Sequence, residues 1–143
     1  MHTVKQILRN KELDEIWSVT PDATVFEAIK EMADRRAGAL LVMEGDALKG
    51  IISERDYARE VILQGRASKD TLVNEIMSSD VISVPSNLSI EASLAVMTQH
   101  NIRHLPIVDN DQVVGVLSIG DLVKGIINEQ QSTIDNLQNY IRG

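Results

Sequence analysis

The sequence of 143 residues contains no cysteine, which excludes disulfide scaffolds, thiolate zinc sites and cysteine nucleophiles. Basic residues are also few: 14 Lys and Arg stand against 21 Asp and Glu, so the net charge of −7 predicts no basic surface for nucleic acid or anionic lipid. Apolar runs stay shorter than the about 18 residues that cross a bilayer, and the N-terminal segment does not resemble a secretory signal. We therefore expect a cytoplasmic protein of one domain or two small halves.

Motifs of the common catalytic sites are missing as well. The sequence has no Walker-type phosphate loop, no cluster of metal ligands and no nucleophile–base pair. His100 and His104 have i, i+4 spacing, but they straddle the end of a predicted helix, so we expect no metal site. An enzyme, for example a hydrolase using Asp56 or Asp121, is therefore a weaker hypothesis than a binding module.

What the sequence does contain is an internal repeat. When the chain is shifted by 65 residues, Ile16–Leu63 aligns with Val81–Asn128 without a gap. The apolar pattern keeps its register, and several identical residues coincide: Ser18 with Ser83, Met32 with Met97, Leu40 with Leu105, Gly50 with Gly115, Ser53 with Ser118 and Asp56 with Asp121. Two copies of one unit predict a paired globule with a cleft between the copies.

Each copy predicts the element order β-α-β-β-α. The first helix carries an apolar stripe at i, i+4 and i+7, and its N-cap is Asp22 or Thr24 in one copy and Ser86 or Ser89 in the other. The remaining elements follow from short apolar runs and turn residues: first strands Ile16–Val19 and Val81–Val84, buried strands Leu40–Met43 and Leu105–Val108, hairpin partners ending at Ile52 and Leu117, and second helices Glu54–Leu63 and Ile119–Asn128.

Three segments lie outside the repeats. Residues 64–76 predict a polar connection with a short helix ending near Met77. The N-terminal segment places Val4, Ile7 and Leu8 on one helical face, and the C-terminal segment does the same with Ile134, Leu137 and Ile141, beside Tyr140. These faces either cover exposed edges of the core or form a self-association surface, and the sequence leaves both interpretations open.

The repeated motifs carry a family resemblance. Gly50–Arg59 and Gly115–Leu122 each contain Gly-apolar-apolar-Ser-x-x-Asp, and Gly38–Val42 and Asn101–Val108 precede them. Together they resemble a tandem pair of cystathionine-β-synthase (CBS) domains over about residues 8–131. In the second copy, Pro85 lies one position earlier than Pro21 does in the first.

The resemblance implies an α+β fold of two CBS units with pseudo-two-fold symmetry and helical extensions at both ends. We expect CBS domain 1 at residues 8–68, CBS domain 2 at 74–131 and a C-terminal helix at 132–143. The family also implies a homodimer and an adenosine-containing ligand between the paired repeats, namely AMP, ADP, ATP, an NAD-type dinucleotide or S-adenosylmethionine. Catalysis and a catalytic cofactor are not expected.

Candidate site residues follow from this resemblance. A Ser-x-x-Asp sequence after a strand is a helix cap, but an ionised aspartate also accepts bonds from both hydroxyls of a ribose. We expect ribose contacts at Ser53, Asp56, Ser118 and Asp121, and phosphate contacts at Arg55, Arg103 and His104. An apolar slot for adenine is expected at Trp17, Ser18, Val19, Ala39, Ile82, Ser83 and Leu105, although core packing is the commoner role of a tryptophan such as Trp17.

The leading functional hypothesis is a sensor of adenine nucleotides that signals to an unidentified target protein. The alternative is a structural dimerisation module with vestigial ligand pockets. The shared Ser and Asp of both copies favour the sensor.

Overall fold

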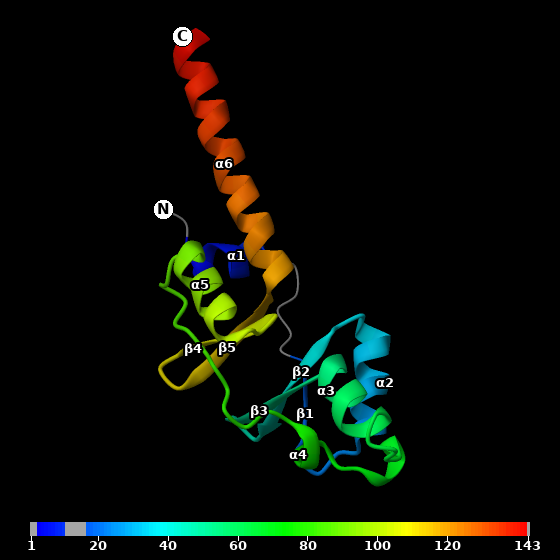
Figure 1. Cartoon of the computed structure of the whole chain (residues 1–143). Helices are drawn as coiled ribbons and strands as arrows, with labels where there is room; N and C mark the ends of the chain where they lie inside the picture. Colours follow the sequence, from blue (N-terminus) through cyan, green and yellow to red (C-terminus); the bar gives the residue numbers. More distant parts are fainter. Residues whose placement is uncertain (1–2, 11–16, 143) are drawn as a thin grey trace. The chain divides into compact units, whose positions relative to one another are not determined.

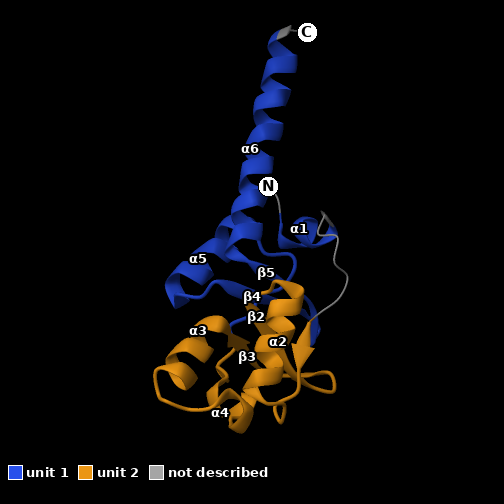
Figure 2. Ribbon diagram, turned by 90° about the vertical axis from the view of Figure 1, so that its right-hand side faces the viewer, with its two compact units in different colours: residues 1–14, 82–143 blue, residues 15–81 orange. Residues whose placement is uncertain are grey.

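The computed structural model describes residues 3–10 and 17–142, which form two compact units (Figures 1 and 2). Unit 1 consists of residues 1–14 and 82–143, and unit 2 of residues 15–81, so each unit contains one repeat. The mixture of helices and antiparallel hairpins confirms the predicted α+β class. Ile16, the first residue of a predicted strand, lies outside the described residues.

Unit 2 contains a three-stranded sheet. Strand β1 (Ser18–Val19) pairs in parallel with β2 (Ala39–Glu44), and β2 pairs antiparallel with β3 (Ala47–Ser53). Gly45 makes the turn of this hairpin with a φ of 61°, a conformation that favours glycine. Three consecutive residues of β2 are buried, Leu40, Leu41 and Val42, so both faces of the strand are covered and its apolar run is explained.

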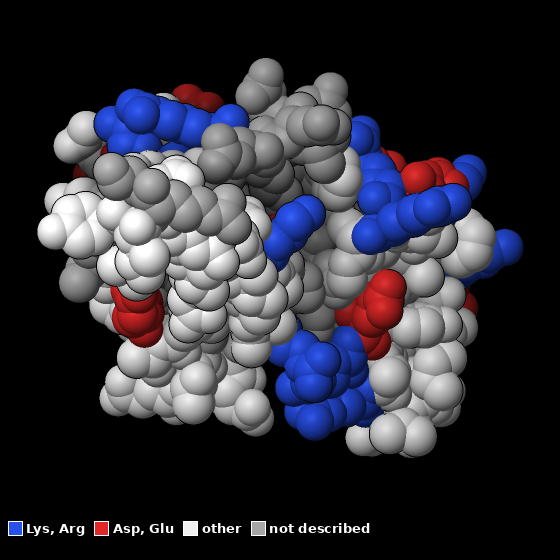
Figure 3. Space-filling view, turned by 90° about the horizontal axis from the view of Figure 1, so that it is seen from above, with Lys and Arg blue, Asp and Glu red and all other residues white. Residues whose placement is uncertain are grey.

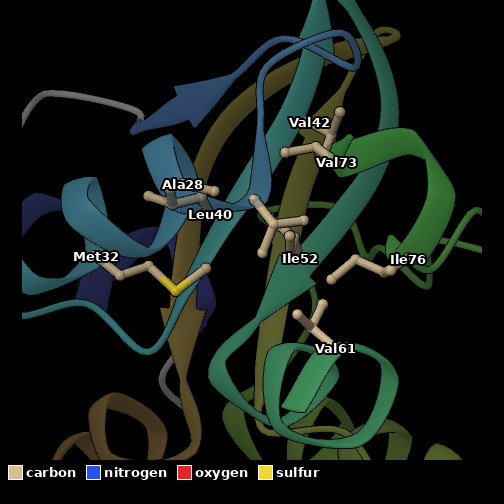
Figure 4. Close-up of a cluster of buried hydrophobic side chains, with 9 residues drawn as sticks. Ala28, Met32, Leu40, Val42, Ile52, Val61, Val73 and Ile76 are labelled. Carbon is tan, nitrogen blue, oxygen red and sulfur yellow. The ribbon is translucent and has the colours of Figure 1, made fainter. Parts of the chain in front are cut away.

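Short helices cover the sheet of unit 2. Helix α2 (Val25–Arg35) is followed, after the hairpin, by α3 (Glu54–Tyr57), a π-helical turn η1 (Ala58–Ile62), a 3-10 turn η2 (Ser68–Asp70) and α4 (Val73–Ile76). The predicted helix Glu54–Leu63 and the short helix near Met77 are therefore confirmed. Figure 4 shows the core that these elements share: Val25, Ala28, Met32, Leu40, Val42, Ile52, Val61, Val73 and Ile76.

Unit 1 has the same plan, with α5 (Ile90–His100), the antiparallel pair β4 (His104–Asp109) and β5 (Gln112–Ser118), and α6 (Ile119–Arg142). The sequence predicts two alternative N-cap residues for the first helix of each repeat. In the structure Thr24 caps α2 and Ser89 caps α5. The core of unit 1 comprises Val4, Val84, Ile90, Met97, Leu105, Ile107, Leu117 and Leu122.

Helix α1 (Val4–Asn10) packs on unit 1, although it precedes the repeat of unit 2 in the sequence. The Val4 N–H donates to the Leu88 carbonyl at 3.0 Å, just as the Val73 N–H at the start of α4 donates to the Ala23 carbonyl at 2.8 Å in unit 2. Leu88 and Ala23 are equivalent in the repeat. Thus α1 packs on unit 1 in the same way as α4 packs on unit 2. The helix that precedes the first repeat in the sequence binds the second repeat, and the helix that precedes the second repeat binds the first.

The predicted strand Val81–Val84 is largely wrong. Unit 1 retains one parallel bridge, between Val84 and Ile107, where unit 2 has the two-residue strand β1. In unit 2 the Leu41 N–H donates to the Trp17 carbonyl at 3.3 Å. The equivalent residue in unit 1 is Pro106, which has no N–H to donate, so this hydrogen bond of the ladder cannot form.

Helix α6 continues without interruption from the second helix of the repeat into the C-terminal segment, over 24 residues. The sequence pattern predicted two elements here, Ile119–Asn128 and residues 132–143. No Gly or Pro lies between Ile126 and Arg142, so nothing in the covalent chain ends the helix there. Among the described residues, no helix combines the length and apolar character of a membrane span.

Candidate functional site

In unit 2 the candidate site is built on the junction between β3 and α3. The Ser53 N–H and hydroxyl donate to Oδ2 of Asp56 at 2.9 and 3.0 Å, and the Asp56 N–H donates to the Ser53 Oγ at 3.2 Å. These bonds form a capping box, so the capping role predicted for this pair is confirmed. Both side chains are half-buried, which leaves the carboxylate at the edge of the surface.

Unit 1 repeats this arrangement where β5 meets α6. The Ser118 N–H donates to Oδ2 of Asp121 at 2.8 Å, and the Asp121 N–H donates to the Ser118 Oγ at 3.1 Å. Because α6 is long, its aligned peptide dipoles give its first turn a partial positive charge that stabilises nearby anions. The two Ser–Asp pairs thus share the reciprocal bonds between side chain and backbone.

Two of the basic candidates lie beside the pair in unit 1. His104 is the cross-strand partner of Ser118, and the Arg103 carbonyl accepts the Ile119 N–H at 2.9 Å. The Arg103 side chain is exposed and that of His104 is half-buried. The structure therefore places Arg103 and His104 next to the Ser118–Asp121 pair, so two basic residues flank the start of α6.

The equivalent neighbours in unit 2 are small. Ala39 is the cross-strand partner of Ser53, and the Gly38 carbonyl accepts the Glu54 N–H at 3.0 Å. Gly38 stands where unit 1 has Arg103, so here the candidate cation is Arg55, which is exposed in the first turn of α3. The two copies therefore share the carboxylate and the hydroxyl but differ in how they place positive charge.

Three of the adenine candidates of unit 2 lie along β1 and the residue before it, and the fourth, Ala39, begins β2. Trp17 and Val19 are half-buried and pack against the core, whereas Ser18 is exposed. The Trp17 indole Nε1 is buried without a hydrogen-bond partner among the described residues, and the Arg35 guanidinium lies 5.2 Å from the centre of the ring. An unpaired buried N–H is unfavourable, so Trp17 has an unused donor.

The corresponding candidates of unit 1 have different environments. Ile82 is half-buried against the core, Ser83 is exposed, and Leu105 is fully buried in the core. The Leu105 side chain therefore packs the interior, and only Ile82 and Ser83 of this group retain exposed surface.

One interaction in unit 1 has no counterpart among the motifs found in the sequence. The Ser86 N–H donates to Asp109 Oδ1 at 2.9 Å, and the Ser86 hydroxyl donates to Oδ2 at 2.5 Å. These two bonds hold the pKa of the Asp109 carboxyl below its usual value. The Lys5 N–H in turn donates to the Ser86 carbonyl at 2.9 Å, so Asp109 supports the segment on which α1 rests.

Neither metal-binding side chains nor surface charge indicates a further binding site among the described residues. Within the described residues, no group of three or more His, Asp or Glu side chains is arranged to hold a metal ion. On the face drawn in Figure 3, basic and acidic side chains are mixed.

Comparisons with known proteins agree with this architecture. A family model described as the CBS domain matches residues 4–63 and 73–128. These matches begin at Val4 and Val73, the first residues of the two equivalent helices α1 and α4. Each family match therefore begins with the helix that precedes a repeat in the sequence, whereas in the structure that helix belongs to the unit of the other repeat.

Three similar proteins illustrate the range. A solved protein with CBS domains from Burkholderia ambifaria MC40-6 is 48% identical, with a TM-score of 0.87 over 90% of this chain and 96% of that chain. The mitochondrial CBS domain-containing protein CBSX3 of Arabidopsis thaliana is 37% identical over 99% of this chain and 72% of its own length. The CBS domain pair of protein MJ0100, solved with 5′-methylthioadenosine and S-adenosyl-L-methionine, shares the fold at 23% identity, with a TM-score of 0.79 over 90% of this chain and 98% of that chain.

Proposed function

Because the chain belongs to the CBS-domain family, we propose that it is a non-catalytic regulatory module that binds an adenosine-containing ligand. CBS pairs are in general regulatory modules, and the candidate ligands are AMP, ADP, ATP, an NAD-type dinucleotide and S-adenosylmethionine. Occupancy would be read by a target protein, and the module would act as a homodimer in the cytoplasm. One relative, CBSX3, is named as mitochondrial, so the cytoplasmic location is part of the proposal.

The observation that carries this proposal is the repeated Ser–Asp pair at a strand-to-helix junction. In each unit the cap bonds go to Oδ2 of the aspartate, and for Asp56 no hydrogen bond to Oδ1 is found among the described residues. A half-buried carboxylate with an oxygen to spare is a strong acceptor for the hydroxyls of a ribose. Helix capping alone does not require the same pair in both repeats, because Ser89 caps α5 without a carboxylate partner.

The neighbouring groups suggest roles for the rest of the ligand. Arg103, His104 and the first turn of α6 would hold a phosphate in unit 1, and Arg55 would do so in unit 2. In unit 2 the adenine ring would lie along β1, where Ser18 is exposed and Trp17 and Val19 are half-buried. The complex of protein MJ0100 supports an adenosine-type ligand, because it shows two such ligands on the same fold.

Calorimetric titration of the full chain with AMP, 2′-deoxy-AMP and adenine tests the proposal. AMP should bind, and removal of one ribose hydroxyl should weaken binding by about tenfold or more, since a hydrogen bond to a charged group contributes about 1.5–3 kcal/mol. Equal affinity for AMP and 2′-deoxy-AMP would show that the two carboxylates do not bind the ribose. If no adenosine ligand binds, the alternative of a structural dimerisation module is favoured. Turnover of AMP or ATP would instead favour the hypothesis that the protein is an enzyme.

A further inference from the structure

From Gln130 onwards, α6 contributes no described side chain to the core of unit 1. Leu122 is the last fully buried residue of the helix, and every residue from Gln130 to Ile141 is exposed. Most of the stability of a helix in a protein comes from packing of its apolar face, and propagation alone adds little in water. This part of α6, which extends beyond the packed helices of unit 1 in Figure 1, therefore lacks the packing partner that normally stabilises a helix.

The exposed apolar residues of α6 repeat every seven residues. Ile127, Ile134 and Ile141 occupy one position of the heptad, and Val123, Gln130 and Leu137 occupy the position four residues earlier. Their spacing alternates between four and three residues, a mean of 3.5, which is the period of a supercoiled seam. We call Val123, Ile127, Gln130, Ile134, Leu137 and Ile141 the α6 seam.

The α6 seam matches a second copy of itself. Lys124 lies beside Val123 at the first position of the seam, but from Ile126 to Ile141 the charged residues are Glu129 and Asp135, and neither lies in the seam or in the positions directly beside it. In a chain with a net charge of −7, this uncharged face is a surface on which two copies meet without repulsion. It also offers no charge to a basic or acidic partner.

The exposed apolar area of the seam is a substantial part of what a stable interface buries. The five apolar seam residues, Val123, Ile127, Ile134, Leu137 and Ile141, are 45%, 58%, 47%, 58% and 80% exposed. Together they offer about half of the roughly 800 Å² per partner that a stable interface buries. Tyr140, 86% exposed in a position beside the seam, supplies more of it.

We propose that the α6 seam pairs with that of a second copy of this chain in a parallel, in-register two-stranded coiled coil. Isoleucine at position a (127, 134 and 141) with leucine at position d (137) is the combination that favours parallel pairs. Gln130 is the polar member of the seam, and it would face its own counterpart in this register and no other. This coiled coil would be an interface of the homodimer proposed above, and its formation does not depend on nucleotide binding.

Sedimentation equilibrium of the full chain tests this interface. Ile134→Lys puts a charge into the seam and should weaken self-association by about tenfold or more. Ser132→Lys is the matched control, because it adds the same charge on the outer side of the helix and should leave the dimer intact. The proposal is overturned if the unmodified chain is a monomer, or if Ile134→Lys dimerises as tightly as the control.

Disulfide trapping then tests the direction of the helices, because the chain has no cysteine of its own. Ile141→Cys, at one end of the seam, should form a covalent dimer in a parallel pair, whereas Asn139→Cys on the outer side should not. Failure of Ile141→Cys to cross-link would rule out the parallel register. AMP titration of Ile134→Lys separates this result from the proposed function, since a monomer that still binds nucleotide leaves that function standing.

Discussion

At the scale of single residues, hydrogen bonds between side chain and backbone fix the candidate site. Thr24 with Glu27, Ser53 with Asp56 and Ser118 with Asp121 all use the same reciprocal pattern over three residues. Such short-range pairs can be predicted from sequence, because both partners lie within one turn of helix. The bond between Ser86 and Asp109 could not be predicted, because 23 residues separate them and only the fold joins them.

Asp109→Asn should reduce stability at neutral pH, and the difference from the unmodified protein should shrink in acid. The folded-state pKa of Asp109 is lowered by its bonds to Ser86. Its contribution is therefore present above the pKa of the unfolded carboxyl, about 4, and is lost as the pH falls towards the lower folded value. Urea unfolding between neutral pH and about pH 3 measures this, with Asp111→Asn as a control that removes an exposed carboxylate from the same hairpin. A difference that does not change with pH would contradict the assigned role of Asp109.

At the scale of elements, the repeat predicted most helices and strands, because apolar spacing reports which face is buried. It failed where one residue changed the backbone chemistry, since Pro106 removes the donor that its equivalent Leu41 supplies. It also could not reveal that α1 packs on the other repeat's unit. Val4 and Val73 are equivalent in structure, but they are 69 positions apart, which differs from the 65-residue offset of the repeats.

Gly50 in β3 should not tolerate a methyl group. A Cβ on Gly50 would lie 2.7 Å from the backbone carbonyl oxygen of Ser78, which follows α4, so the two segments would have to separate. Gly50→Ala should therefore lower the free energy of unfolding by about 1–3 kcal/mol. Gly120→Ala is the control, because its Cβ would meet only the Ser118 Oγ at 3.6 Å, and alanine in a helix is up to about 1 kcal/mol more favourable than glycine. Thermal unfolding measures both, and equal stability of the two variants would contradict this packing.

At the scale of the whole molecule, unit 1 depends on a helix supplied from a distant part of the chain. Val4 is completely buried in unit 1, and the Ile7 and Leu8 side chains lie against Gly125 and Gly115 of that unit. The binding of α1 therefore links the N-terminal segment to the stability of the C-terminal repeat.

Deletion of residues 1–10 should destabilise unit 1 selectively. Removing α1 takes Val4 out of the core and leaves the Ser86 and Leu88 carbonyls without their donors. Hydrogen exchange should accelerate in β4 and β5 and stay nearly unchanged in β2 and β3. Faster exchange in β2 and β3 instead would show that α1 supports unit 2.

The measurement that addresses nucleotide binding most directly is the dissociation constant of AMP for an Asp56→Asn, Asp121→Asn double variant, with Glu27→Gln as the control. Asparagine keeps a carbonyl oxygen for the helix cap but loses the charge that a ribose would bind, and Glu27 is the carboxylate of a capping box outside the candidate site. Binding should weaken by at least about tenfold in the double variant and remain unchanged in the control. Unchanged AMP affinity in the double variant would contradict the assignment of the two carboxylates to the ligand.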